Sequence, residues 1–114
     1  LQETVSGPRS RKVMTLEFTD AAVSDLQSIR NYTLAKWGER QEQVYLDAMW
    51  DRFEEILTEP NRSRAREDLF PGCQLAAQGK HVILFRVQRK TLQIVRILHS
   101  HMDYPQHLPP EVAE

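Results

Sequence analysis

Apolar and polar residues follow two rhythms along this chain, and together they predict its secondary structure. Residues 14–18 (MTLEF) alternate apolar and polar side chains, which is the pattern of a strand with one buried face. From residue 19 to residue 57 the apolar side chains instead recur at steps of three and four, as they do on a helix with one buried face. The domain therefore begins with a short strand that is followed by helical segments.

Two amphipathic helices separated by a glycine are predicted in this helical stretch. Thr19 can cap the first helix and Gly38 can end it, and the second helix is expected from Glu39 to about Leu57. Because so few residues separate the helices, they must fold back on each other as a hairpin. The positions expected to face the core are Ala22, Leu26, Ile29, Thr33 and Trp37 on the first helix and Leu46, Met49, Trp50, Phe53 and Leu57 on the second, with Tyr45, Ala48, Arg52 and Ile56 beside them.

Three strands with tight turns are predicted in the second half of the chain. Residues 73–78, 81–87 and 91–98 have the composition of strands, and short polar turns separate them. Such strands form an antiparallel meander, which can receive the helical hairpin on one face. Residues 61–67 are polar and lack a period, so we expect a loop there, followed by a turn at 68–72. The expected fold class is α+β, in the order β-α-α-β-β-β, with the hairpin packed on a small, mostly antiparallel sheet.

Length and composition indicate a single domain. The chain has 114 residues, of which 40% are hydrophobic and 27% charged, as in an ordinary globular protein. We expect a flexible leader or cloning-derived extension at 1–13, the domain at 14–108 and an irregular tail at 109–114. No apolar run approaches the roughly 20 residues that a membrane span needs. The single Cys73 cannot form an internal disulfide. These features favour a cytoplasmic protein that does not bind a membrane.

The net charge of −1 hides a strong asymmetry. Residues 15–60 carry ten acids and four bases, a net charge of −6, whereas residues 61–102 carry two acids and eight bases, a net charge of +6. Such a dipole indicates either a partner surface or a network of ion pairs between the two halves, and the counts do not separate the two. The isoelectric point is near 6.5, so the chain does not have the excess of basic residues expected of a free-standing protein that binds nucleic acid in a sequence-specific way.

Several strings, taken in order, resemble the ParE family of toxins from bacterial toxin–antitoxin modules. No single string is specific, but their order and spacing cover about residues 14–108. They are Ala21-Ala22 with Asp25-Leu26 and Ile29, then YTLAKWG at 32–38, DLFPG at 68–72, HVILFR at 81–86 and IVRILHSHMD at 94–103.

This resemblance implies the toxin of a type II module in the RelE/ParE superfamily, of the kind that stabilises plasmids. Such a toxin binds and inhibits DNA gyrase without being an enzyme, so neither catalytic residues nor cofactors are expected. The resemblance also implies a ParD-type antitoxin that neutralises the toxin in a hetero-oligomer.

The alternative is the RelE-like branch, whose members cut messenger RNA on the ribosome. Cleaving a phosphodiester needs a base, an acid and cations beside the phosphate. Where such enzymes carry a pair of lysines, this chain has Cys73-Gln74-Leu75, and near the end of the last strand it has His99, His101 and Asp103 in place of arginines and a tyrosine. A carboxylate beside the phosphate would repel it. The nuclease hypothesis is weaker but open, because the histidines could act as acid and base with a strand arginine on the phosphate.

The candidate gyrase contacts lie on the last two strands and the segment that follows. Arg86 and Arg96 sit in otherwise apolar strands, Arg96 in phase with Leu92 and Ile94, so each guanidinium must be paired or reach the rim of the sheet. For at least one of them we expect an ion pair with an acid of the hairpin. No metal site is expected at the two histidines, because a convincing third ligand is missing. The candidates are Arg86, Arg96, His99, His101, Met102 and Asp103.

The helical hairpin and a free edge strand are the candidate antitoxin surface. Aromatic residues at helical spacing usually belong to the core, yet the hairpin offers more apolar surface than a four-stranded sheet needs. A helix or an added strand of a partner could cover this surplus, and residues 14–18 are the expected free edge. Arg86 is included as a group that an acidic antitoxin tail would mask. The candidates are Leu16, Phe18, Tyr32, Trp37, Tyr45, Met49, Trp50 and Arg86.

Overall fold

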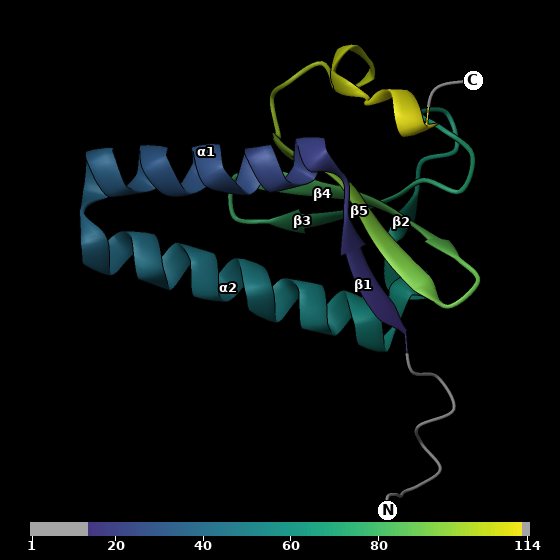
Figure 1. Ribbon diagram of the computed structural model, residues 1–114, viewed down its shortest axis with the longest axis horizontal. Helices are drawn as coiled ribbons and strands as arrows, with labels where there is room; N and C mark the ends of the chain where they lie inside the picture. The colour runs from purple at the N-terminus through teal and green to yellow at the C-terminus, as the bar shows by residue number, and fades with distance from the viewer. Residues whose placement is uncertain (1–13, 113–114) are drawn as a thin grey trace, which may run out of the picture.

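The chain folds as two helices packed on a five-stranded, mostly antiparallel sheet (Figure 1). The computed structural model describes residues 14–112, so the leader expected at 1–13 lies outside the described residues. No helix in the described range is long and apolar enough to cross a bilayer. The α+β class and the predicted order are confirmed, with one additional strand. The elements are β1 (Thr15–Phe18), α1 (Asp20–Trp37), α2 (Glu39–Thr58), η2 (Pro60–Arg62), β2 (Arg64–Ala65), β3 (Gln74–Gln78), β4 (His81–Gln88), β5 (Thr91–His99), η3 (Tyr104–His107) and η4 (Pro110–Val112).

The strand order β1-β5-β4-β3-β2 places β1 and β2 at the two edges of the sheet. β1 runs parallel to β5, and the other neighbouring strands pair antiparallel. Among the described residues nothing pairs with the outer side of β1, so the expected edge strand is confirmed. β2 was missed: Arg64 and Ala65 pair with Leu75 and Gln74, and the prediction of a loop throughout 61–67 was wrong there. A two-residue strand is too short to show an alternating pattern.

A β-bulge in β5 decides which way Arg96 faces. Leu84 of β4 pairs with Arg96, and the next residue of β4 pairs with Ile94, so Val95 has no partner on β4. This extra residue puts Arg96 on the same face as its partner Leu84, and out of phase with Leu92 and Ile94. The predicted phase of Arg96 was therefore wrong, because simple alternation assumes an unbroken ladder.

Different parts of the chain cover the two faces of the sheet. The helical hairpin covers one face, where Met49 and Phe53 of α2 belong to the same core as Phe85 of β4. The segment around Phe70 and the C-terminal residues cover the other face, where Val112 is buried. Residues 109–112 are therefore part of the folded domain, and Pro110–Val112 forms a short 3-10 helix. The prediction of an irregular tail from residue 109 relied on its prolines and missed this apolar anchor.

The predicted residues begin and end α1. Thr19 caps its start: the Thr19 hydroxyl accepts from the N–H of Ala22 at 3.0 Å and donates to the carbonyl of Val95 at 2.7 Å. A single glycine then reverses the chain between the two helices. Gly38 ends α1 with a φ of +93°, a conformation that strains any residue with a Cβ. The closed end of the hairpin projects beyond the strands (Figure 1). Trp37 was expected in the core, but it is 61% exposed at this closed end.

Candidate functional site

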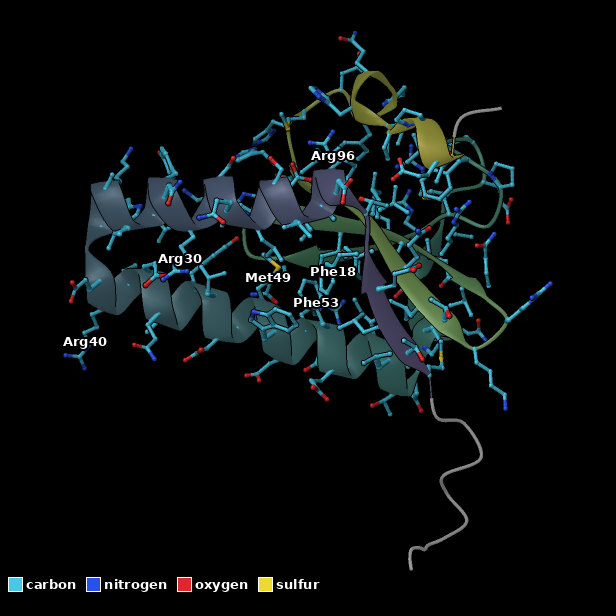
Figure 2. The ribbon with its side chains drawn as sticks, viewed as in Figure 1. Phe18, Arg30, Arg40, Met49, Phe53 and Arg96 are labelled. Carbon is cyan, nitrogen blue, oxygen red and sulfur yellow. The ribbon has the colours of Figure 1, made fainter. Side chains whose placement is uncertain are left out.

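Arg96 is tied to the first helix, and Figure 2 shows it beside the start of α1. Its guanidinium donates to both carboxylate oxygens of Asp25, at 2.5 and 2.7 Å, and to the carbonyl of His107. Asp25 also accepts from the backbone N–H of Ile97 at 2.9 Å, where β5 has run past the end of β1. The hydrogen bond to Asp25 raises the pKa of Arg96. The ion pair expected for one of the two strand arginines is confirmed.

Arg86 lies far along the sheet from the histidines at the end of β5. Its Nε donates to Oε1 of Gln93 at 2.8 Å, and Gln93 is also its partner in the β4–β5 ladder. Within residues 14–112 no carboxylate forms an ion pair with it. Six positions separate Gln93 from His99 on β5, which corresponds to about 20 Å. The structure therefore separates Arg86 from the candidate gyrase contacts at the end of β5, although Arg96 lies opposite Leu84, two positions from Arg86 on β4.

Four rings gather where the β3–β4 turn meets the end of β5. The hydroxyl oxygen of Tyr45, on α2, lies 2.6 Å from Nδ1 of His81. His81 and His99 are partners across β4 and β5, with ring centroids 5.7 Å apart, and the rings of His99 and His101 are 5.3 Å apart. We call Tyr45, His81, His99 and His101 the histidine end. Within residues 14–112 no group of three or more side chains is arranged to hold a metal ion.

The turn at Gly79 and Lys80 is shaped around the hydroxyl of Tyr45. This oxygen accepts from the backbone N–H of Lys80 at 3.2 Å and lies 3.1 Å from the carbonyl oxygen of Gln78. A Cβ on Gly79 would lie 2.6 Å from the hydroxyl oxygen, so a larger residue would displace the ring. Burial raises the pKa of Tyr45, and the Lys80 N–H acts in the opposite direction. The hydroxyl therefore keeps its proton at neutral pH and can donate it to Gln78 or to His81.

Protonation of His81 should make the free energy of unfolding depend on pH. Burial and then the nearby His99 lower the pKa of His81, while Asp25 acts in the opposite direction. Because the unfolded chain then binds this proton more readily, stability should fall as the pH falls below the ordinary histidine value of about 6.5. We expect the urea midpoint of unfolding to decrease between about pH 7.5 and about pH 5.5, and to decrease less in His81→Asn. Equal decreases in the two proteins would contradict this account.

The histidine end contains two of the candidate gyrase contacts, His99 and His101, and adjoins two more, Met102 and Asp103. The N–H of Met102 donates to the carbonyl of His99, which turns the chain back directly after β5. Met102 is 41% exposed, and His101 and Asp103 are exposed as well. His99, His101, Met102 and Asp103 thus form one continuous segment, which we call the β5 exit. His81 was missed as a candidate, because its proximity to His99 depends on the strand register.

A second surface forms where the free side of β1 meets α2. Phe18 of β1 packs edge to face on Trp50 and Phe53 of α2, with ring centroids 5.7 and 5.4 Å apart. Figure 2 shows Phe18 and Phe53 close together between the strand and the helix. Trp50 nevertheless stays 44% exposed, and Leu16 is half-buried. We call Leu16, Phe18 and Trp50 the hairpin edge.

The other candidate antitoxin contacts lie apart from the hairpin edge. Met49 is fully buried between the hairpin and the sheet, so it offers no surface to a partner. Tyr45 belongs to the histidine end. Tyr32 and Trp37 are each 61% exposed near the closed end of the hairpin, where the Lys36 ammonium lies 5.6 and 5.7 Å from their ring centroids. The structure therefore divides the candidate list into separate surfaces.

Comparison with known proteins identifies the family. A family model described as the ParE toxin of the type II toxin–antitoxin system parDE matches residues 16–104. This chain belongs to the ParE toxin family. A Mycobacterium tuberculosis protein named Toxin ParE1 is 30% identical over 89 residues, which cover 77% of this chain and 91% of that protein. A Caulobacter vibrioides protein, also named Toxin ParE1, is 32% identical over 87 residues, which cover 76% and 90%.

A solved structure has the same ParE fold. It is described as the chromosomal ParDE TA system from P. aeruginosa, and it aligns with a TM-score of 0.66 at 22% identity. The alignment covers 77% of this chain and 97% of that one. The family match begins in β1 and ends just after the β5 exit, so both surfaces lie within the ParE domain. The chain is thereby the toxin component of a type II toxin–antitoxin module.

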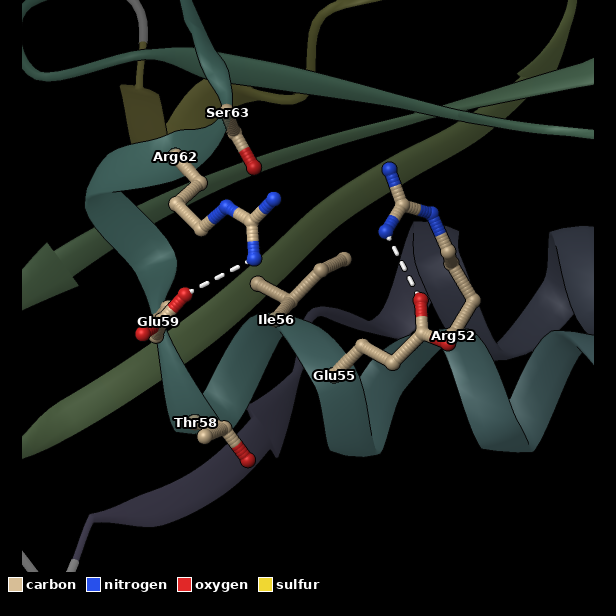
Figure 3. Close-up of a pocket in the computed structure, with 7 residues that line it drawn as sticks. All are labelled: Arg52, Glu55, Ile56, Thr58, Glu59, Arg62 and Ser63. Atoms are coloured by element: carbon tan, nitrogen blue, oxygen red, sulfur yellow. Dashed lines mark hydrogen bonds and ion pairs between the residues drawn. The ribbon is translucent and has the colours of Figure 1, made fainter.

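A pocket at the end of α2 was not anticipated from the sequence of this ParE family member. It has a volume of about 540 Å³, and two arginines point into it (Figure 3). Arg52 donates to Glu55 at 3.0 Å and to the carbonyl of Ala77, while Arg62 donates to Glu59 at 3.0 Å. Because each guanidinium already faces a carboxylate, we assign this pocket no role. Its lining residues are Arg52, Glu55, Ile56, Thr58, Glu59, Arg62 and Ser63.

Proposed function

We propose that this ParE family member inhibits DNA gyrase by binding it at the β5 exit, without catalysing a reaction. The observation that carries the proposal is that neither strand arginine is free beside the histidines. Arg96 is held by Asp25, and Arg86 lies about 20 Å from His99. A nuclease needs cations on the phosphate beside its acid and base, and neither arginine is free for that task at the histidine end. The resemblance to ParE toxins supplies gyrase as the target.

A ParD-type antitoxin neutralises the toxin by covering the hairpin edge. The free side of β1 offers backbone donors and acceptors to an added strand. Beside it, Trp50 is packed against Phe18 and Phe53 but still exposed, so a partner can bury the indole without first ordering it. The similar P. aeruginosa structure is described as a ParDE system, which supports a hetero-oligomer of toxin and antitoxin.

The test adds the purified chain to gyrase with plasmid DNA and, separately, to translating ribosomes with messenger RNA. We expect supercoiling to be lost or cleaved plasmid to accumulate, the message to stay intact, and the antitoxin to restore gyrase. The double variant His101→Ala with Met102→Ala changes exposed side chains of the β5 exit and should lose most of this inhibition. The double variant Val23→Ala with Gln27→Ala, which changes two exposed side chains of α1 away from the β5 exit, is the matched control and should retain it. Cleavage of the message with gyrase untouched would overturn the proposal.

One observation favours messenger RNA cleavage as a second candidate function. Lys80 and the histidine end bring a lysine, a tyrosine hydroxyl and three imidazoles to one end of the sheet. The lowered pKa of His81 keeps its ring neutral at pH 7, as a general base requires, although Tyr45 already occupies its Nδ1. The ribosome arm of the same experiment decides between the candidates. Cleavage that disappears in both His99→Ala and Tyr45→Phe would establish the second.

A further inference from the structure

Two acidic side chains flank the exposed tryptophan of the hairpin edge. Asp47 precedes Trp50 by three positions and Glu54 follows it by four, so both lie next to it on the surface of α2. Both are exposed, and within residues 14–112 neither forms an ion pair. Arg52, the nearest base on α2, is engaged with Glu55 and the carbonyl of Ala77 on β3. The hairpin edge therefore combines an aromatic ring, a free strand edge and uncompensated negative charge.

We infer that the antitoxin segment docked at the hairpin edge is an extended, positively charged strand that places Lys or Arg against Asp47 and Glu54. This inference rests on the proposed neutralisation by an antitoxin and adds the chemistry of the segment that performs it. The hairpin edge therefore differs from the surface at Arg86, for which the sequence predicted an acidic tail of the antitoxin. The same partner segment cannot suit both, because the charges at the two places are opposite.

The free side of β1 determines the extended form of the segment. β1 is bonded only to β5 within the described residues, and Leu16 and Phe18 face the helical hairpin. A strand added at this edge alternates its side chains between the two faces of the sheet. Every second side chain of the segment then points to the side where Trp50 and its acidic neighbours lie. A helix laid over this edge would leave the backbone groups of β1 unpaired.

The side chains around Trp50 determine the charge of the segment. An arginine can stack on an indole and form paired hydrogen bonds with a carboxylate, so Trp50 with Asp47 or Glu54 fits a guanidinium. A lysine supplies the same charge without the planar contact. An acidic segment would bring like charges together over these two carboxylates, and such a juxtaposition opposes binding.

The experiment compares two double variants with the same change in net charge. Asp47→Asn with Glu54→Gln removes the two carboxylates beside Trp50, and Glu39→Gln with Glu111→Gln removes two exposed carboxylates elsewhere. Affinity for the product of the neighbouring antitoxin reading frame is measured at about 50 mM and about 300 mM salt. Urea unfolding first confirms that both variants are folded.

Binding should weaken about tenfold in the Asp47 and Glu54 variant at low salt, and its dependence on salt should be flatter than that of the wild type. The control variant should stay within about twofold of the wild type. Equal affinities of the two variants would overturn the inference while leaving the antitoxin proposal intact, and tighter binding by the Asp47 and Glu54 variant would show an acidic segment instead. If the wild type does not bind the antitoxin, the proposed neutralisation itself fails and this inference fails with it.

Discussion

Replacing Asp25 with alanine should lower the free energy of unfolding at pH 7 by about 3 kcal/mol. The Asp25 carboxylate accepts three hydrogen bonds, two from the Arg96 guanidinium and one from the backbone N–H of Ile97. Without it, a guanidinium that is only 19% exposed loses its counter-charge, and the N–H of Ile97 loses its partner. For a domain of this size, a loss of about 3 kcal/mol should lower the melting temperature by more than about 10 °C.

A matched control separates this cost from the loss of an ordinary surface carboxylate. Asp51→Ala on α2 removes an exposed acid that forms no ion pair within residues 14–112, and it should change stability by less than about 0.5 kcal/mol. Adding Arg96→Met to Asp25→Ala should recover part of the loss, because no uncompensated charge then remains. A loss below about 1 kcal/mol in Asp25→Ala would mean that solvent replaces the carboxylate, and the ion pair would not anchor the start of α1.

The strands and helices could be predicted because the spacing of apolar residues reflects which face of each element is buried. The same holds for Thr19 and Gly38, since a helix cap and a reversal after a helix have local signals. β2 and the bulge at Val95 were missed for the opposite reason. Both arise from pairing between strands distant in sequence, and the local pattern contains no information about register.

The candidate site was predictable only where its residues are contiguous. The residues of the β5 exit lie in one short stretch, so the sequence alone could group them as candidates, and their contact with gyrase stays a prediction. The partners Tyr45 and His81 were not found together, because 36 positions separate them and only the packing of α2 on the β3–β4 turn joins them. Asp25 was noted as part of a family string, but its bond to Arg96, 71 positions away, depends on the bulge.

The charge asymmetry now favours a partner surface over a network of internal ion pairs. Within residues 14–112, two ion pairs link the acidic stretch 15–60 to the basic stretch 61–102. One joins Asp25 to Arg96, and the other joins Glu59 to Arg62 across a single turn. Most of the opposite charges therefore do not neutralise each other. They remain available to a partner.

Trp50→Ala should weaken antitoxin binding by about 30-fold to 1000-fold, because a tryptophan at the centre of an interface commonly contributes about 2–4 kcal/mol. Phe18 and Phe53 hold the indole at ring-centroid separations of 5.7 and 5.1 Å, so little side-chain freedom is lost when a partner covers it. Removing the indole also takes some packing from the core beneath it. Affinity should therefore be measured by calorimetry at a temperature where urea unfolding shows the variant to be folded.

Trp37→Ala provides the comparison, since it removes the same side chain from the closed end of the hairpin. Trp37 is 61% exposed, more than the 44% of Trp50, so exposed area alone would give it the larger effect. The closed end lies about 17 Å along α2 from Trp50, beyond the reach of a strand paired with the four residues of β1. Trp37→Ala should therefore stay within about threefold of the wild type. A larger loss there than in Trp50→Ala would move the antitoxin contact to Tyr32 and Trp37 and away from the hairpin edge.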